Sequence, residues 1–315
     1  MTYLNENKKI NKLKKHNLSN NKKKFYNVEN IFYLIKSIII KLINGTLYYI
    51  WELIYGFMDI IKLFKYKNIY KDKVALILGN GPSQEYITKK DLITFKKKGI
   101  IFFVNYWFLN KNIRKIIPHF LVISDIRLLN KESDNFFNSK NKILLKYIKK
   151  HIPMKIICPI RAKKKLLKIV KDEDRIIAFC DSELRGILSN TLPIFPRGYI
   201  SMTVYKAIAL ANWMNFKKIF ILGVDNTYPR NTYSDINNSI LNHEIHAGKK
   251  FNETTVVNNT SYYGSMADLF QEISFLFRDA YKLNINNNIY NLDQYSLTDA
   301  FKKQKFHKGF FKNLK

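Results

Sequence analysis

The chain has 315 residues, with 54 Lys or Arg against 24 Asp or Glu, so its formal net charge is +30. Its apolar and aromatic content excludes a globally disordered protein, and its length fits one large α/β domain with appendages, or two small domains. The charge suggests a nucleic acid or an anionic membrane as partner. Because Lys, Asn and Ile recur even in loop-like segments, we attribute part of the excess to composition. The two cysteines, Cys158 and Cys180, form no metal-binding cluster, which favours a reducing compartment and argues against a zinc site.

Residues 1–24 are predicted to be a disordered basic tail, because they hold eight lysines, six asparagines and one acidic residue. No short apolar stretch with a cleavage site follows closely, so the pattern is not that of a signal peptide.

Residues 25–70 are predicted to hold an amphipathic helix, most clearly over 31–64. The longest uncharged run, 42–51, is shorter than the roughly 20 residues of a membrane span. On a helical projection Lys41, Glu52, Asp59 and Lys62 gather on one side, and Ile, Leu, Phe, Tyr and Trp fill the remaining arc. This pattern favours a helix lying in an anionic membrane surface, assisted by the lysine tail. The alternative is packing on its own domain or on another subunit.

Residues 71–304 are predicted to form one Rossmann-like domain. Strands are expected at 74–79, 99–105, 119–125, 155–160, 175–180 and 217–225, and helices at 85–98, 140–151, 163–171, 201–214 and 265–283. Most strand candidates are continuous apolar runs, typical of strands covered on both faces. We therefore expect an α/β fold, a mostly parallel sheet with helices on both faces. Residues 288–301 predict a short strand, a turn and a helix start, and 305–315 a second basic tail.

The first strand ends in a turn of five residues, Gly79, Asn80, Gly81, Pro82 and Ser83. Glycines let a ligand approach the backbone, and the free N–H groups of a helix start attract anions, so the turn suits a phosphate. The alternative is an ordinary strand-to-helix turn that binds nothing, since the full G-x-G-x-x-G and Walker spacings are absent.

Other polar residues follow strands or begin a helix. In a parallel sheet the ligand lies at the carboxyl ends of the strands, which gives priority to Asn105, Asp125 and Asp225. The aromatic residues 106–108 are a candidate stacking wall. Arg197 precedes the helix for which Ser201 is the expected N-cap, and together they make a second place for an anion. For each residue the alternative is a capping or surface role.

The polar stretch 226–264 contains no clear core element and is predicted to be a lid or substrate loop. Within it, His243 and His246 are candidate general bases. Their spacing of three differs from that of the zinc-protease motif, so no metal site is predicted. Ordinary surface histidines are the alternative.

Three blocks carry a family resemblance: LILGNGPS at 76–83, VNYWF at 104–108 and IALANWMNFKKIFILGVD at 208–225. They resemble the bacterial family-42 sialyltransferases and the wider group of proteins related to 6-hydroxymethylpterin pyrophosphokinase. The ending IYNLDQYSLTDAF is similar to the closing pattern of that wider group. The resemblance covers blocks between residues 73 and 302, and its middle third matches poorly.

The resemblance implies a role for several residues. The turn 79–83 would hold the phosphate and ribose of a CMP-linked sugar, Asn105 and Asp125 would contact the nucleotide, and Asp225 and Tyr228 would lie near the base or phosphate. No metal or other cofactor is implied.

One position departs from the family pattern. Tyr262 stands where the sialyltransferases keep a histidine base, and a tyrosine with a pKa near 10 is a poor base at neutral pH. Either His246 replaces that base, or the chain is not a sialyltransferase.

The sequence thus predicts a metal-independent glycosyltransferase that moves a sugar from a nucleotide sugar to a lipopolysaccharide or other surface glycan. Its expected partners are the nucleotide sugar, a glycan or lipid-linked acceptor and an anionic membrane surface, with a homo-oligomer as a further option and no nucleic acid. The protein is expected to be cytoplasmic and peripherally associated with the inner face of the membrane. The alternatives are a pyrophosphokinase using Mg²⁺ and ATP, with carboxylates such as Asp125 and Asp225 around the metal, and a non-catalytic membrane-bound binding protein.

Overall fold

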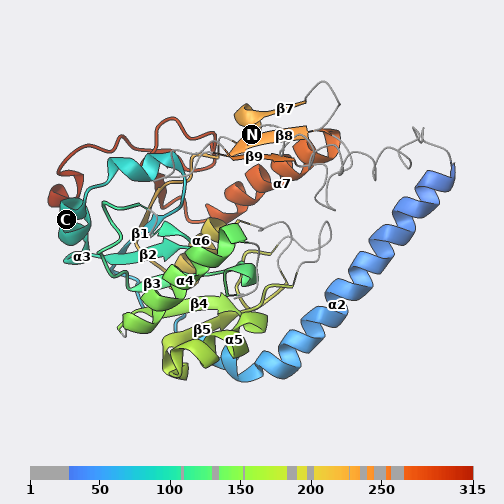
Figure 1. Cartoon of the computed structure of the whole chain (residues 1–315), viewed down its shortest axis with the longest axis horizontal. Helices are drawn as coiled ribbons and strands as arrows, with labels where there is room; N and C mark the ends of the chain where they lie inside the picture. Colours follow the sequence, from blue (N-terminus) through green and yellow to red (C-terminus); the bar gives the residue numbers. More distant parts are fainter. Residues whose placement is uncertain are drawn as a thin grey trace. The chain divides into compact units, whose positions relative to one another are not determined.

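The structure is a computed structural model (Figure 1). It describes residues 28–107, 110–129, 135–151, 153–182, 190–196, 202–226, 228–234, 240–244, 253–256 and 266–314. The chain divides into two compact units, one ending at Asn44 and the other running from Gly45 to Lys315. The predicted tail at 1–24 lies outside the described residues.

An eight-stranded sheet forms the centre of the second unit. Its spatial order is β11 (Lys302–Lys303), β10 (Ile289–Asn291), β6 (Lys218–Leu222), β1 (Val74–Leu78), β2 (Ile100–Val104), β3 (Phe120–Val122), β4 (Lys155–Pro159) and β5 (Ile176–Phe179). All neighbouring strands run parallel; Leu76, for example, pairs with Ile101 on one side and Phe220 on the other. The predicted Rossmann-like sheet is confirmed, and all six predicted strands form with shorter bounds, most markedly at β3 and β6.

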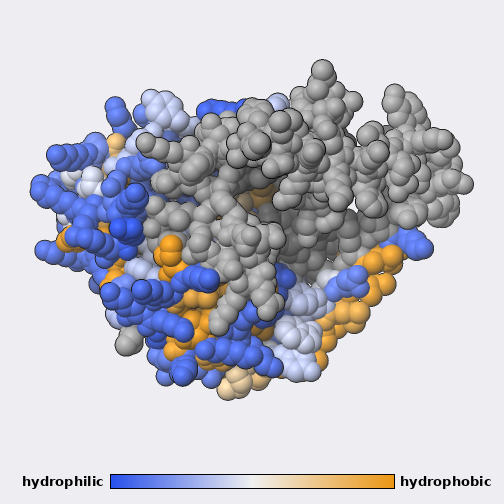
Figure 2. All heavy atoms as spheres, viewed as in Figure 1, coloured by the Kyte–Doolittle hydropathy of each residue, from blue (hydrophilic) through white to orange (hydrophobic). Residues whose placement is uncertain are grey.

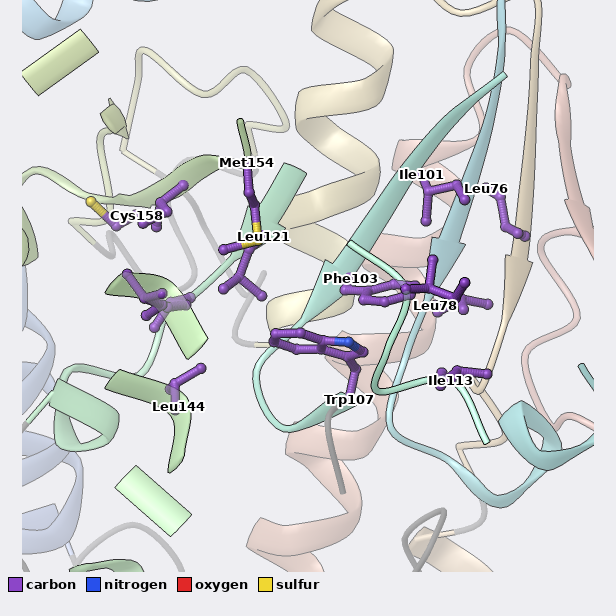
Figure 3. Packing of buried hydrophobic residues seen from close by; sticks show 14 of the residues in the cluster. Leu76, Leu78, Ile101, Phe103, Trp107, Ile113, Leu121, Leu144, Met154 and Cys158 are labelled. Carbon is purple, nitrogen blue, oxygen red and sulfur yellow. The ribbon is translucent and has the colours of Figure 1, made fainter. Parts of the chain in front are cut away.

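Helices cover both faces of this sheet, as predicted. One layer contains α3 (Lys89–Lys96), α4 (Asn135–Lys150) and α5 (Ile160–Val170), and the other α6 (Thr203–Trp213) and α7 (Met266–Leu283). Alternate strand residues serve the two layers: Leu76 and Leu78 pack in the first, and Ala75 and Ile77 in the second. Figure 3 shows the first of these clusters from close by. Strands buried on both faces explain the continuous apolar runs of the sequence.

Helix α4 begins at Asn135 and α5 at Ile160, before the expected 140 and 163, and two other helix starts differ in how they are capped. The segment after β1 begins with a short 3₁₀ helix, η1 (Pro82–Tyr86), before α3 starts behind a capping box of Thr88 and Asp91. The N-cap of α6 is Met202, which makes no side-chain capping bond, so the expected cap at Ser201 is wrong. Ser201 itself lies outside the described residues.

The polar stretch 226–264 contains structure where the sequence predicts a loop. After the short helix η5 (Tyr228–Asn231) comes an antiparallel sheet of β7 (Thr232–Ser234), β8 (Ile240–Glu244) and β9 (Glu253–Val256). These strands are short and largely polar, so the apolar pattern that identifies core strands is missing.

The C-terminal segment also differs from the expectation. Residues 292–301 form turns after β10, without the predicted helix start. Between 305 and 315, the 3₁₀ helix η7 (Phe310–Asn313) buries Phe310 and Phe311 against Phe95 and Phe220. The expected basic tail therefore contributes to the core, because burying its two phenylalanines is favourable while the surrounding lysines stay exposed. The remaining short helices are η3 (Ile126–Leu129) and η4 (Glu173–Arg175).

The predicted amphipathic helix is confirmed as α2 (Val28–Phe64), whose part from Gly45 onward belongs to the second unit. No helix among the described residues is both long and apolar enough to cross a bilayer.

Candidate functional site

The candidate site lies at the carboxyl edge of the sheet, between β1 and β6. The chain builds outward from β1 to β5 and then crosses back to place β6 on the other side of β1. Such a reversal of strand order opens a crevice where ligands of α/β proteins bind. The turn after β1, Gly79 to Ser83, therefore stands beside the turn after β6, Gly223 to Asp225.

These two turns are bonded directly to each other. The carboxylate of Asp225 accepts hydrogen bonds from the backbone N–H and the hydroxyl of Ser83, both at 3.0 Å. The Ser83 hydroxyl oxygen accepts in turn from the N–H of Gly223 at 2.9 Å, and Gly81 donates its N–H to the Gly223 carbonyl at 2.9 Å. The structure thus brings the predicted residues Ser83 and Asp225 together.

The glycines of the first turn are explained by this contact. A Cβ on Gly81 would lie 1.9 Å from Oδ2 of Asp225, and one on Gly79 would lie 2.1 Å from the Gly223 carbonyl oxygen. The N–H groups of Gly81, Ser83 and Gln84 already have acceptors within the protein. In this conformation they are not free for a phosphate, and Pro82, at the start of η1, has no N–H.

Asp225 has an acidic neighbour that sequence reasoning missed. Asp293 follows β10, its backbone N–H donates to Asn291, and both Asp225 and Asp293 are buried. Burial, assisted by the neighbouring Asp293, raises the pKa of Asp225 to about 7. The available signal was the IYNLD sequence, which places an aspartate just after a predicted strand, as in ILGVD.

The raised pKa predicts how Asp225 affects stability. The unfolded carboxyl ionises near its ordinary 3.8, whereas the folded one stays protonated up to about pH 7. Between pH 3.8 and about 7 the folded protein holds a proton on Asp225 that the unfolded chain has released. The stability that this proton contributes is fully present below pH 3.8 and is lost as the pH rises through about 7. Asparagine does not titrate, so the free energy of unfolding of Asp225→Asn should rise relative to that of wild type as the pH increases from 3.8 to about 7. Above about pH 7 the difference between the two proteins should stay constant. Urea unfolding at several pH values measures this difference, and parallel profiles would contradict it.

Two amide side chains at neighbouring strand ends have unused hydrogen-bonding capacity. The Oδ1 atoms of Asn80, after β1, and Asn105, after β2, are buried and have no hydrogen-bond partner among the described residues. The Nδ2 of Asn105 donates to Oγ1 of Thr203 at 3.0 Å, and Ser124 bonds to the same hydroxyl. Asn105 also has φ of 42°, a strained backbone conformation found often at ligand sites. Buried polar groups normally have partners. Within the described part of the chain the amide oxygens of Asn212, Asn284 and Asn288 also lack one, but Asn80 and Asn105 differ from these in following neighbouring strands at the carboxyl edge of the sheet, where a ligand can supply the missing donors.

The remaining predicted residues are placed unevenly. Asp125 is half-buried after β3, and its carbonyl accepts from Leu128. Tyr228 begins η5 and His243 lies in β8, and only their backbones are described. Arg197, Ser201, His246 and Tyr262 lie outside the described residues, so their roles stay predictions.

The predicted aromatic stacking wall is wrong at Trp107. This side chain is fully buried, and Figure 3 shows it beside Phe103, with the two ring centroids 5.3 Å apart. The ring centroid of Tyr147 lies 4.7 Å away. Trp107 belongs to the same core cluster as Leu76 and Leu78, so its ring is not available to stack on a ligand. Among the described residues, no group of three His, Cys, Asp or Glu side chains could hold a metal ion.

No family model and no curated protein matches this chain. Among solved structures, it is similar to the MAf glycosyltransferase from Magnetospirillum magneticum AMB-1, with a TM-score of 0.41 and 11% sequence identity. The match covers 82% of this chain and 38% of the other, so the chain spans well under half of that protein's length. At this level of similarity the match does not decide the activity.

Proposed function

We propose that the chain is a glycosyltransferase that moves a sugar from a nucleotide-sugar donor, CMP-linked in the first instance, to a surface glycan or lipid-linked acceptor. The observation that carries the proposal is the pair of buried, unpartnered amide oxygens of Asn80 and Asn105 beside the reversal of strand order. An unsatisfied buried polar group costs about 1–3 kcal/mol, which a ligand with matching donors recovers. The amino group of cytosine and the hydroxyls of ribose are such donors.

The phosphate requires a different partner from the one expected. Because the N–H groups of Gly81, Ser83 and Gln84 are bonded internally, the backbone of this turn is a poor anion site. In the proposed function the turn positions Asn80 for the nucleoside, and we assign the phosphate to Arg197 and Ser201, which precede α6 in the sequence. A guanidinium beside a helix start is suited to that role.

The transfer itself needs a base for the acceptor. An acceptor hydroxyl attacks the anomeric carbon of the donor, the bond from that carbon to the phosphate oxygen breaks, and the nucleotide leaves with the bonding electrons. We assign the hydroxyl proton to His246, with His243 and Tyr262 as the other candidates in the segment 226–264. No resident metal or cofactor enters this proposal.

The pyrophosphokinase alternative is supported by the adjacent carboxyl groups of Asp225 and Asp293. Phosphoryl transfer of that kind uses Mg²⁺ held by carboxylates at the ATP phosphates. In the structure the Asp225 carboxylate is bound to Ser83, so this role would require those bonds to break.

The test measures nucleotide binding to the purified chain by titration calorimetry with CMP-, UDP- and GDP-sugars. We expect one of these classes to bind, and Asn105→Ala to weaken its binding by about tenfold or more. Asn288→Ala is the matched control, because Asn288 precedes β10 at the opposite edge of the sheet and bonds to Phe216.

Three outcomes would contradict the proposal. They are no binding of any nucleotide sugar, binding that is unchanged by Asn105→Ala, and release of AMP from ATP that depends on Mg²⁺. The last outcome would establish the pyrophosphokinase alternative, and binding of a nucleotide sugar without turnover would favour the non-catalytic one.

A further inference from the structure

The part of α2 in the second unit is bound to the domain through its charged side. Glu52 is fully buried and accepts from the backbone N–H groups of Asp181 at 2.9 Å and Ser182 at 3.0 Å. Two turns further on, Asp59 forms an ion pair with Lys163 at 2.6 Å. Lys62 pairs with Glu173 at 3.0 Å. Three of the charges that gather on one side of the helical projection, Glu52, Asp59 and Lys62, are therefore paired within the protein.

Small residues bring this side of α2 close to its neighbours. Gly45 and Gly56 are buried on the same side as Glu52, and a Cβ on Gly56 would lie 2.5 Å from Cδ1 of Ile160 at the start of α5. The Leu63 carbonyl accepts from the indole N–H of Trp213 at 2.9 Å. The contact is thus specific and close.

The opposite side of α2 is apolar and exposed. Its members share one stripe of the helix, at spacings of three and four residues: Leu47, Ile50, Ile54, Phe57, Met58 and Ile61. Their exposed fractions run from 40% at Ile61 to 68% at Ile54. Figure 2 shows hydrophobic residues, in orange, along this helix. We call this stripe the apolar face of α2.

An exposed apolar stripe of this length is unusual for a surface helix. A helix that belongs to a globular domain turns its apolar side toward the core and its charges toward water. Here the charged side is bound to the domain and the apolar side is exposed. Exposure of this apolar face to water is unfavourable. Contiguous exposed apolar surfaces mark sites for a membrane or a protein partner.

We propose that the apolar face of α2 binds the surface of an anionic lipid bilayer, lying in its interface without crossing it. The sequence preceding α2 carries eight lysines against one acidic residue, a charge that attracts anionic lipid headgroups. Trp51, which is 39% exposed, and Tyr55 add aromatic rings suited to that interface. A second copy of the chain is less suited to this face, because it would bring another net charge of +30.

The experiment measures cosedimentation of the full chain with vesicles of phosphatidylcholine, alone or mixed with phosphatidylglycerol. We expect binding to the mixed vesicles, and Ile54→Glu with Met58→Glu to weaken it by about tenfold or more. The matched control is Ile285→Glu, which changes a 73% exposed isoleucine after α7 and should bind as wild type does. Circular dichroism confirms that the variants are folded. No nucleotide is present, so the result is independent of the proposed function.

A second readout needs no variant. Of the three tryptophans, Trp107 and Trp213 are buried, so acrylamide quenching reports mainly on Trp51. Mixed vesicles should protect it from quenching and shift its emission to the blue.

Specific results would overturn the inference. They are absence of vesicle binding, vesicle binding that the double variant retains in full, and unchanged quenching of Trp51. A further one is a wild-type dimer in sedimentation equilibrium that the double variant converts to a monomer without any vesicle binding, which would assign the face to a second copy.

Discussion

Replacing Glu52 by alanine is expected to lower the free energy of unfolding by about 3 kcal/mol or more. The carboxylate is fully buried and accepts from two backbone N–H groups just beyond β5. Asp181, which supplies one of them, holds Lys206 at 2.7 Å and Arg161 at 3.1 Å through its own carboxylate. Alanine would leave both N–H groups unpaired in a site that water does not reach.

Chemical denaturation followed by circular dichroism measures this loss. Glu85→Ala removes an exposed glutamate from η1 and should change the stability by no more than about 0.5 kcal/mol. Glu52→Gln keeps one acceptor oxygen at nearly the same volume, so its loss should fall between the two. An equal effect of Glu52→Ala and Glu85→Ala would show that α2 is not held as described.

Replacing Gly81 by alanine is expected to cost about 1–3 kcal/mol and to disturb the turn that positions Asn80. Gly81 has φ of −68° and ψ of 161°, a conformation that any residue adopts. On backbone grounds alone alanine would be neutral or stabilising by about 0.4–1 kcal/mol. The loss therefore comes from the new Cβ, 1.9 Å from Oδ2 of Asp225 and 2.9 Å from the Gly223 carbonyl oxygen.

A double-mutant cycle isolates the steric cause. Asp225→Ser shortens the side chain that the new methyl group would meet, so Gly81→Ala should cost less in that background than in wild type. A coupling energy above about 0.5 kcal/mol in this direction is expected from denaturation curves of the four proteins. Additive effects would mean that the two turns are not in the contact described.

The sheet could be predicted from the sequence because its strands are buried on both faces. Apolar runs such as VALIL and KIFIL indicate buried strands by their composition alone, and β1 and β6 form where those runs lie. The placement of Asn105 and Asp225 at one edge followed from the parallel order. The helix α2 was predicted as an element, but periodicity shows only which side of a helix is polar, not what that side packs against.

The features that the sequence did not predict depend on contacts between distant segments. The need for glycine at position 81 follows from the approach of Asp225, which no local pattern contains. The pairing of Asp225 with Asp293 depends on β10 lying beside β6. The strands β7 to β9 are too short and polar to stand out from a loop. Phe311 fell in a lysine-rich segment, so composition concealed its place in the core.

In the proposed function, the carboxyl edge of the sheet binds the nucleoside of a nucleotide sugar through Asn80 and Asn105. The most direct measurement is a crystal structure of the chain soaked with CMP. We expect the cytidine beside the turn after β1, with its amino or hydroxyl groups within hydrogen-bonding distance of the Asn105 amide. CMP bound elsewhere, or this edge left empty at a saturating concentration of CMP, would contradict it.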